Sequence, residues 1–239
     1  MTQSSAPTEK KVGSVFDLPA KSLKIVKENW KVFAIVNVLS IISAIFTIFD
    51  SSSAKDNKFS GFDKNAIASG GELSVALGAG IVVFIIFLAI GIFLYAMSTS
   101  LEVRASKGET PALKTIFEDG KKYWLRLFGL NIVAGFIVLI GLILLIVPGL
   151  IAIGRLVFSS YQMVDKDLGI EDSLKASNNM SKGRASAVWS AILLFVAIAI
   201  LTGIVSAVPV IGPIVGTAAA IAYSLILVLR YRELKAIGA

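Results

Sequence analysis

The sequence predicts an all-α, polytopic membrane protein, with six transmembrane helices in three hairpins and with amphipathic helices along the cytoplasmic membrane surface. Composition is the first reason: of 239 residues, 56% are hydrophobic and only 16% are charged, against about 25% charged in an ordinary soluble domain. The second reason is that the apolar residues form long runs, and about 20 such residues cross a bilayer as a helix. We expect a disordered tail over residues 1–13 and a single membrane domain over residues 14–239.

The composition also excludes several classes of function. The chain has no cysteine and no histidine, so disulfides, thiol nucleophiles, the usual zinc sites and histidine acid–base catalysis are absent. It carries no phosphate-cradling loop or dinucleotide fingerprint. We therefore expect no enzyme, no cofactor and no metal site. The net charge of +7 is assigned to the membrane surface, with anionic lipids as partners and no nucleic acid.

The first part of the chain is predicted to be an interfacial helix followed by a hairpin. Residues 15–30 alternate apolar and basic positions at helical spacing, and Lys27 and Trp30 suit a headgroup layer. Span 1 is expected over residues 32–49. A polar loop follows, and span 2 is expected over residues 73–97.

A second interfacial helix is predicted before the next hairpin. It begins at Thr110-Pro111, a capping hydroxyl followed by proline. Its basic and aromatic interfacial residues are Lys121, Lys122, Trp124 and Arg126. Span 3 is expected over residues 128–147, Pro148-Gly149 is expected to make the turn, and span 4 is expected over residues 150–164. Span 4 would be only about 22 Å long, so either the bilayer thins or the turn lies below the membrane surface.

The last hairpin follows a third polar stretch, residues 165–186, whose middle is predicted to be weakly amphipathic helix. Arg184 and Trp189 are its interfacial residues, and spans 5 and 6 are expected over residues 187–208 and 214–229. Small residues recur at four-residue spacing, a pattern that lets membrane helices approach closely. The residues assigned to this packing are Gly203, Gly212, Gly216 and Ala220. Packing between spans 5 and 6 is the preferred interpretation, and a homo-oligomer interface is the alternative.

The basic residues predict the orientation. With six spans, 20 of the 23 Lys and Arg residues lie in segments on one side, and basic segments stay in the cytoplasm. Both termini are therefore expected in the cytoplasm. Four full spans, with the short ones re-entrant, is the alternative.

Arg155 is the leading candidate for a binding residue, because a charge at membrane depth costs at least about 2.5 kcal/mol on insertion scales. No Asp or Glu lies within a predicted span. The expected companions are Asn37, Asn131, Tyr161 or a lipid phosphate, and a guanidinium suits an anion or lipid headgroup. The alternative is a structural arginine that extends to the interface or ties two helices together.

Three functions follow as hypotheses. The preferred one is a non-enzymatic membrane protein that binds lipid, organises the membrane or scaffolds an unidentified membrane protein at the cytoplasmic face. The alternative is a small transporter or flippase that moves an anionic solute or lipid past Arg155. The third is a lipid-modifying enzyme that uses the carboxylates of residues 165–172.

Six short motifs occur in a defined order. They are KGETP at 107–111, LIVPGL at 145–150, Arg155, an acidic turn at 165–167, SLKAS at 173–177 and KGR at 182–184. Their order and spacing resemble the glycerophosphoryl diester phosphodiesterase membrane-domain family and related uncharacterised six-span prokaryotic inner-membrane proteins. The resemblance covers residues 100–190, with Ser173-Leu174 in place of the usual Ala-Leu. It implies a six-span fold in a prokaryotic cytoplasmic membrane and leaves the activity open, since the histidines of the phosphodiesterase chemistry are absent here.

Overall fold

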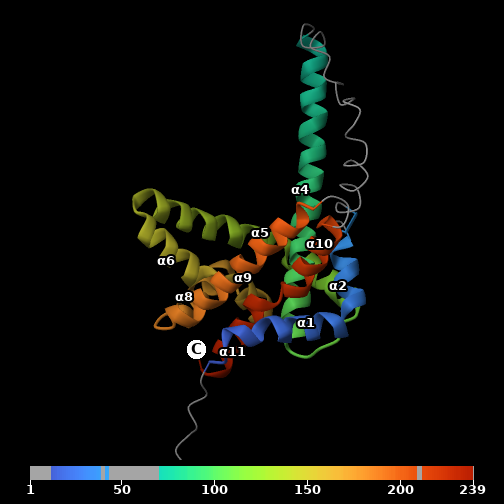
Figure 1. Ribbon diagram of the computed structural model, residues 1–239. Helices are drawn as coiled ribbons and strands as arrows, with labels where there is room; N and C mark the ends of the chain where they lie inside the picture. Colours follow the sequence, from blue (N-terminus) through green and yellow to red (C-terminus); the bar gives the residue numbers. More distant parts are fainter. Residues whose placement is uncertain (1–11, 39–40, 43–69, 209–211, 239) are drawn as a thin grey trace, which may run out of the picture.

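The computed structural model describes residues 12–38, 41–42, 70–208 and 212–238, with backbone only for residues 70–80 and for residue 83. Within these residues every regular element is a helix (Figure 1), as predicted. The tail 1–11, most of predicted span 1, the polar loop before residue 70 and the turn 209–211 lie outside the described residues.

The described part of the chain contains helices and no strands. They are the 3-10 helix η1 (Val15–Asp17), α1 (Leu18–Glu28), α2 (Trp30–Val36), α4 (Gly70–Ser106), α5 (Leu113–Leu144), α6 (Ile146–Leu156), α7 (Ser159–Lys166), α8 (Ile170–Ser181), α9 (Ala185–Ser206), α10 (Gly212–Tyr223) and α11 (Ile226–Ala236). Five helical stretches are long and apolar enough to cross a membrane. They are Phe84–Ser106, Leu113–Leu144, Ile146–Lys166, Ala185–Ser206 and Gly212–Ala236.

The predicted N-terminal amphipathic helix is present as α1. Its buried face, Leu18, Ser22 and Val26, packs toward α10 and α11, and the Ser22 hydroxyl donates a hydrogen bond to the Ala222 carbonyl at 2.6 Å. The helix is interrupted at Asn29, whose side-chain amide donates to the Ile25 carbonyl. Trp30, at the start of α2, is 60% exposed, as an interfacial tryptophan requires.

The second interfacial helix and span 3 are not separate elements, contrary to the prediction. They form one continuous helix, α5, whose N-cap is Ala112 and not Thr110. The change from amphipathic to fully apolar sequence at residue 128 contains no proline or capping residue, so nothing interrupts the backbone hydrogen bonds. Gly120 lies inside α5 and lets it approach α4, because a Cβ there would be 2.6 Å from Met97 Cγ.

The prediction that Pro148-Gly149 makes the turn is also wrong. The chain reverses at Leu145, where φ is −159° and ψ is 141°, and Pro148 lies in the first turn of α6, where its missing N–H needs no partner. Gly149 lies against α5, since a Cβ there would be 2.4 Å from Leu142 Cγ. A Cβ on Gly141 would in turn be 2.9 Å from Gly149 Cα, so the two helices of this hairpin meet backbone to backbone.

Predicted span 4 is longer than expected and has a break within it. α6 and α7 together cover Ile146–Lys166, interrupted at Val157-Phe158. The hydroxyl of Ser177 in α8 accepts a hydrogen bond from the Phe158 amide at 3.2 Å and donates one to the Arg155 carbonyl at 2.7 Å. A side chain from another helix therefore holds both ends of this break.

Predicted span 5 is present as α9, whereas predicted span 6 is divided between α10 and α11 at Ser224-Leu225. Packing of α9 on α10 involves Gly212 and Gly216, because a Cβ on Gly212 would be 2.5 Å from the Val205 carbonyl oxygen and one on Gly216 would meet Ser206 Oγ. Gly203 is not in close contact with α10, since no atom of the other described elements lies within 4 Å of its Cβ position. Ala220 lines a cavity of about 360 Å³ between the two helices.

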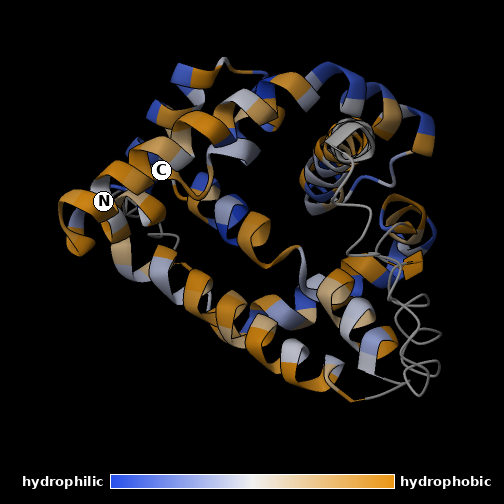
Figure 2. Cartoon of the chain, turned by 90° about the horizontal axis from the view of Figure 1, so that it is seen from above, coloured by the Kyte–Doolittle hydropathy of each residue, from blue (hydrophilic) through white to orange (hydrophobic). Residues whose placement is uncertain are grey.

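The hydrophobic core lies where α1, α2, the C-terminal half of α4, α7 and α11 meet. Away from it, the helices carry large exposed apolar side chains, and Figure 2 shows long helical stretches in the hydrophobic colour. The two views agree that α5 runs crosswise to α4, which is upright in Figure 1. The exposed apolar surface is the kind that hydrocarbon covers.

Candidate anion-binding site

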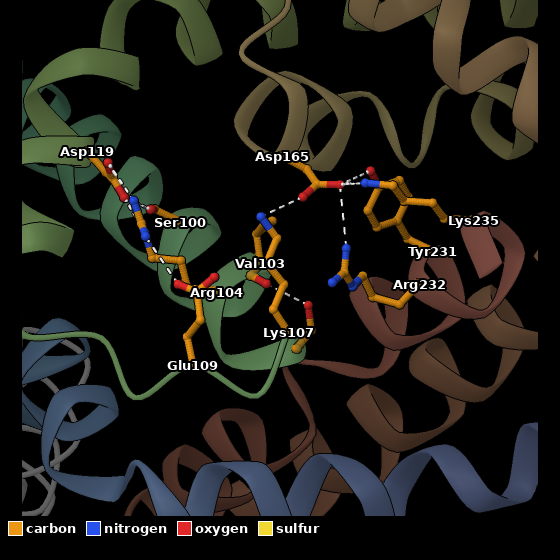
Figure 3. Close-up of polar contacts among 11 residues, drawn as sticks. Ser100, Val103, Arg104, Lys107, Glu109, Asp119, Asp165, Tyr231, Arg232 and Lys235 are labelled. Carbon is orange, nitrogen blue, oxygen red and sulfur yellow. Dashed lines mark hydrogen bonds and ion pairs between the residues drawn. The ribbon is translucent and has the colours of Figure 1, made fainter.

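Two ionic clusters join the helices at the polar end of the molecule (Figure 3). The first surrounds Asp165 at the end of α7, whose side chain is only 1% exposed. Lys107 lies 2.8 Å from it, the Tyr231 hydroxyl donates to it at 2.6 Å, and Arg232 and Lys235 also pair with it. This carboxylate therefore ties α7 to the end of α4 and to α11.

The second cluster joins α4 to α5. Arg104 Nε donates to Asp119 at 2.7 Å and Nη1 donates to Glu109 at 3.1 Å. The Ser100 hydroxyl donates to the same Asp119 carboxylate. In both clusters the charged groups pair with one another, so we assign them a structural role.

Two predicted interfacial residues, Lys122 and Arg126, form ion pairs within the protein. Both bind Asp167, at 2.7 and 2.8 Å, and Arg126 also donates to the Leu168 carbonyl at 2.8 Å. Hydrogen bonds from Lys122 and then Arg126 lower the pKa of Asp167. Asp167 itself ends α7 in the left-handed conformation, with φ of 53°.

The other interfacial candidates differ in their surroundings. Lys27 is exposed on α1, Lys121 lies 4.6 Å from the centre of the Phe117 ring, and Trp124 packs against the smaller hydrophobic cluster. Arg184 occupies the N-cap position of α9.

Three of the four carboxylates of residues 165–172 are ion-paired in the described structure. Asp165 and Asp167 are paired as above, and Glu171 pairs with Lys175 at 2.5 Å. Among the described residues, no three acidic side chains converge as a metal site would require.

Arg155 lies at the C-terminal end of α6 and is exposed, but its expected companions are elsewhere. Its guanidinium donates to Asn178 Oδ1 at 3.4 Å. Asn37 and Asn131 instead donate to carbonyls of their own helices, those of Phe33 and Leu127, and Tyr161 donates to Glu102. The sequence did not single out Asn178, because its proximity depends on α8 folding back along α6.

A pocket of about 260 Å³ opens beside Arg155, and we call it the Arg155 pocket. Its lining residues are Ile151, Gly154, Arg155, Ser181, Lys182, Gly183, Ala185, Val188 and Trp189. They come from α6, from the turn between α8 and α9, and from the first turns of α9. Gly154 lets Trp189 form one wall, since a Cβ at Gly154 would be 3.1 Å from the indole Nε1.

The polar groups of the Arg155 pocket favour an anion. Among the described residues, no carboxylate oxygen lies within 4.0 Å of the charged groups of Arg155 or Lys182. α9 begins at this pocket without a side-chain cap, so its first N–H groups and its helix dipole add positive potential. A turn with φ of 77° at Gly183 leads the chain from Lys182 into α9.

Ser181 supplies the most specific feature of the pocket. The residue is 6% exposed, and within the described structure its Oγ has no hydrogen-bond partner. A buried hydroxyl without a partner costs about 1–3 kcal/mol, so a ligand oxygen that reached it would recover that cost. Arg155, Lys182, Ser181 and the N-terminal turn of α9 thus border one small volume, which can hold a tetrahedral oxyanion such as a phosphate group.

The fold defines a class: an all-helical chain with several helices that are long and apolar enough to cross a membrane, with a cationic pocket at its polar end. Comparisons with protein-family models, with curated proteins and with solved structures found no match. The resemblance to the phosphodiesterase membrane-domain family therefore stays a prediction.

Proposed function

We propose that this chain is an integral membrane protein of six membrane-inserted segments, with cytoplasmic termini, that binds an anionic phospholipid by its headgroup phosphate in the Arg155 pocket. The observation that carries the proposal is the buried Ser181 hydroxyl, which has no hydrogen-bond partner among the described residues, beside two cations that have no carboxylate partner among them. The exposed apolar helices around it supply the surface on which the acyl chains would lie.

A lipid fits this pocket better than a soluble anion because apolar side chains lie next to the cations. Trp189 and Ile151 give the cationic pocket an apolar wall, and the neighbouring face of α6 is exposed and apolar. A phospholipid matches both parts, because its phosphate meets the cations while its glycerol and first methylenes meet the apolar wall. Free phosphate would contact the cations only.

Native mass spectrometry of the protein from nanodiscs containing phosphatidylglycerol tests this proposal. We expect wild type to retain the anionic lipid, and Arg155→Leu to retain about 10- to 100-fold less, because a hydrogen bond to a charged group contributes about 1.5–3 kcal/mol. Ser181→Ala should retain about fivefold less, since it removes about 1 kcal/mol of ligand interaction.

Lys175→Leu is the matched control, because it removes one charge from α8 outside the pocket, where Lys175 pairs with Glu171. It should bind lipid as wild type does. Equal retention by wild type, Arg155→Leu and Ser181→Ala would contradict the proposal. Displacement of the lipid by millimolar inorganic phosphate would show instead that the pocket serves a soluble anion.

A further inference from the structure

The tip of the α5–α6 hairpin is an apolar surface that the rest of the described chain does not cover. Residues 143–147, at the reversal of the chain, are 65 to 75% exposed. From Ile132 to Gly154 the sequence has no polar side chain on either arm of the hairpin. A turn that emerged on the far side of a membrane would place this surface among headgroups and water, where each apolar side chain is unfavourable.

The length of α6 limits how deep this tip can go. Nine residues, 146–154, separate the reversal at Leu145 from Arg155, which is about 14 Å at 1.5 Å per residue. The hydrocarbon core is about 30 Å thick. The tip therefore lies at most about half a core thickness beyond the level of Arg155, whatever the tilt of the hairpin.

The polar helix α8 sets that level. Its Ser177 hydroxyl is hydrogen-bonded to the Arg155 carbonyl and the Phe158 amide at the α6–α7 break, so Ser177 and Arg155 lie at the same depth. Helix α8 exposes Glu171, Asp172 and Asn179, and Lys182 follows it directly. An exposed helix with charges of both signs is not stable in hydrocarbon, which places Arg155 in the headgroup layer.

The other arm of the hairpin agrees with this placement. From Leu127 to Leu144, α5 has 18 residues without a charge, about 27 Å of helix. An arm of that length reaches a depth of about 14 Å only if it runs obliquely, and α5 does run crosswise to α4 in Figure 1.

We propose that the α5–α6 hairpin inserts into a single leaflet, with its tip in the hydrocarbon, and returns to the side from which it entered. Its partner is the acyl-chain layer of that leaflet. The hairpin occupies volume in one leaflet only, so the protein acts as a one-sided wedge in the membrane. The inference stands on the hairpin and α8, and does not depend on whether the Arg155 pocket binds lipid.

The natural absence of cysteine makes single-cysteine labelling a direct test in the full chain. Leu145→Cys reports the tip, Lys182→Cys the pocket side and Ser52→Cys the polar loop that the sequence assigns to the opposite side. With a membrane-impermeant maleimide, we expect Lys182→Cys and Ser52→Cys to react from opposite sides, and Leu145→Cys to react from neither until detergent is added. Reaction of Leu145→Cys from the side of Ser52→Cys would overturn the proposal.

A nitroxide attached at Leu145→Cys separates the remaining outcomes. In hydrocarbon, its collisions with oxygen should be frequent and those with a water-soluble nickel complex rare, with the reverse at Lys182→Cys. Frequent nickel collisions at the tip would mean that the turn emerges into water. Rare collisions with both reagents would mean that protein, such as a second copy of the chain, covers the tip. Either result contradicts insertion of the tip into one leaflet.

Discussion

At the scale of single residues, the structure separates charges that hold the fold from charges that remain for a ligand. Lys122 and Arg126 were predicted for the membrane surface, and both bind Asp167. Arg155, which the sequence analysis singles out, has no carboxylate partner in the described chain, whereas its neighbours Asn178 and Ser181 are not predicted from the sequence. Such neighbours depend on how α8 returns along α6, and spacing in the sequence carries no information on that path.

Asp165 is the residue whose loss should damage the fold most directly. Asp165→Asn removes the charge that Lys107, Lys235 and the Tyr231 hydroxyl share. We expect it to lower the free energy of unfolding by about 2 kcal/mol, a value within the range for hydrogen bonds to a charged group. Thermal unfolding in one detergent measures the effect. Asp172→Asn is the control, an exposed carboxylate on α8, and an equal effect of the two changes would refute the role given to Asp165.

At the scale of elements, the sequence identified most helices by type and misplaced several of their ends. Apolar runs and amphipathic periodicity predicted α1, α9 and the arms of the α5–α6 hairpin. The pattern of polar residues indicates which face of a helix is polar, but it does not indicate where the helix ends. Hydropathy therefore predicts a boundary near residue 128, and α5 continues through it. At the break between α6 and α7, Ser177 of α8 bonds to both helix ends. This is a tertiary contact, which local sequence patterns do not predict.

The α5–α6 hairpin should be sensitive to the size of residue 149. In Gly149→Ala, the new Cβ would lie 2.4 Å from Leu142 Cγ and 2.7 Å from the Leu142 backbone nitrogen, so the helices must separate. We expect a loss of about 1–3 kcal/mol from overpacking, measured as a lower midpoint of thermal unfolding. Gly135→Ala, on α5, places its Cβ more than 4 Å from every other described side chain. It should leave the midpoint unchanged or raise it, since alanine favours helix by about 1 kcal/mol. Equal midpoints for both variants would rule out close packing at Gly149.

At the scale of the whole molecule, the described chain has a polar, ion-paired end and apolar helices that extend away from it. The sequence predicted the all-helical class from composition alone, and five helices long enough to cross a membrane agree with it. It could not predict how deep each segment lies, because depth follows from contacts such as that between α8 and α6. The same contact places the Arg155 pocket beside the base of the hairpin, at the level that we propose for the lipid headgroups.

Solid-state NMR of the distance between lipid phosphorus and arginine nitrogen tests the proposal that a lipid phosphate occupies the Arg155 pocket. The sample is wild type with ¹⁵N-labelled arginine in phosphatidylglycerol-containing membranes, compared with Arg155→Gln. We expect ¹⁵N–³¹P dephasing in wild type that falls in Arg155→Gln and weakens in Ser181→Ala. Dephasing that is identical in wild type and Arg155→Gln would contradict it.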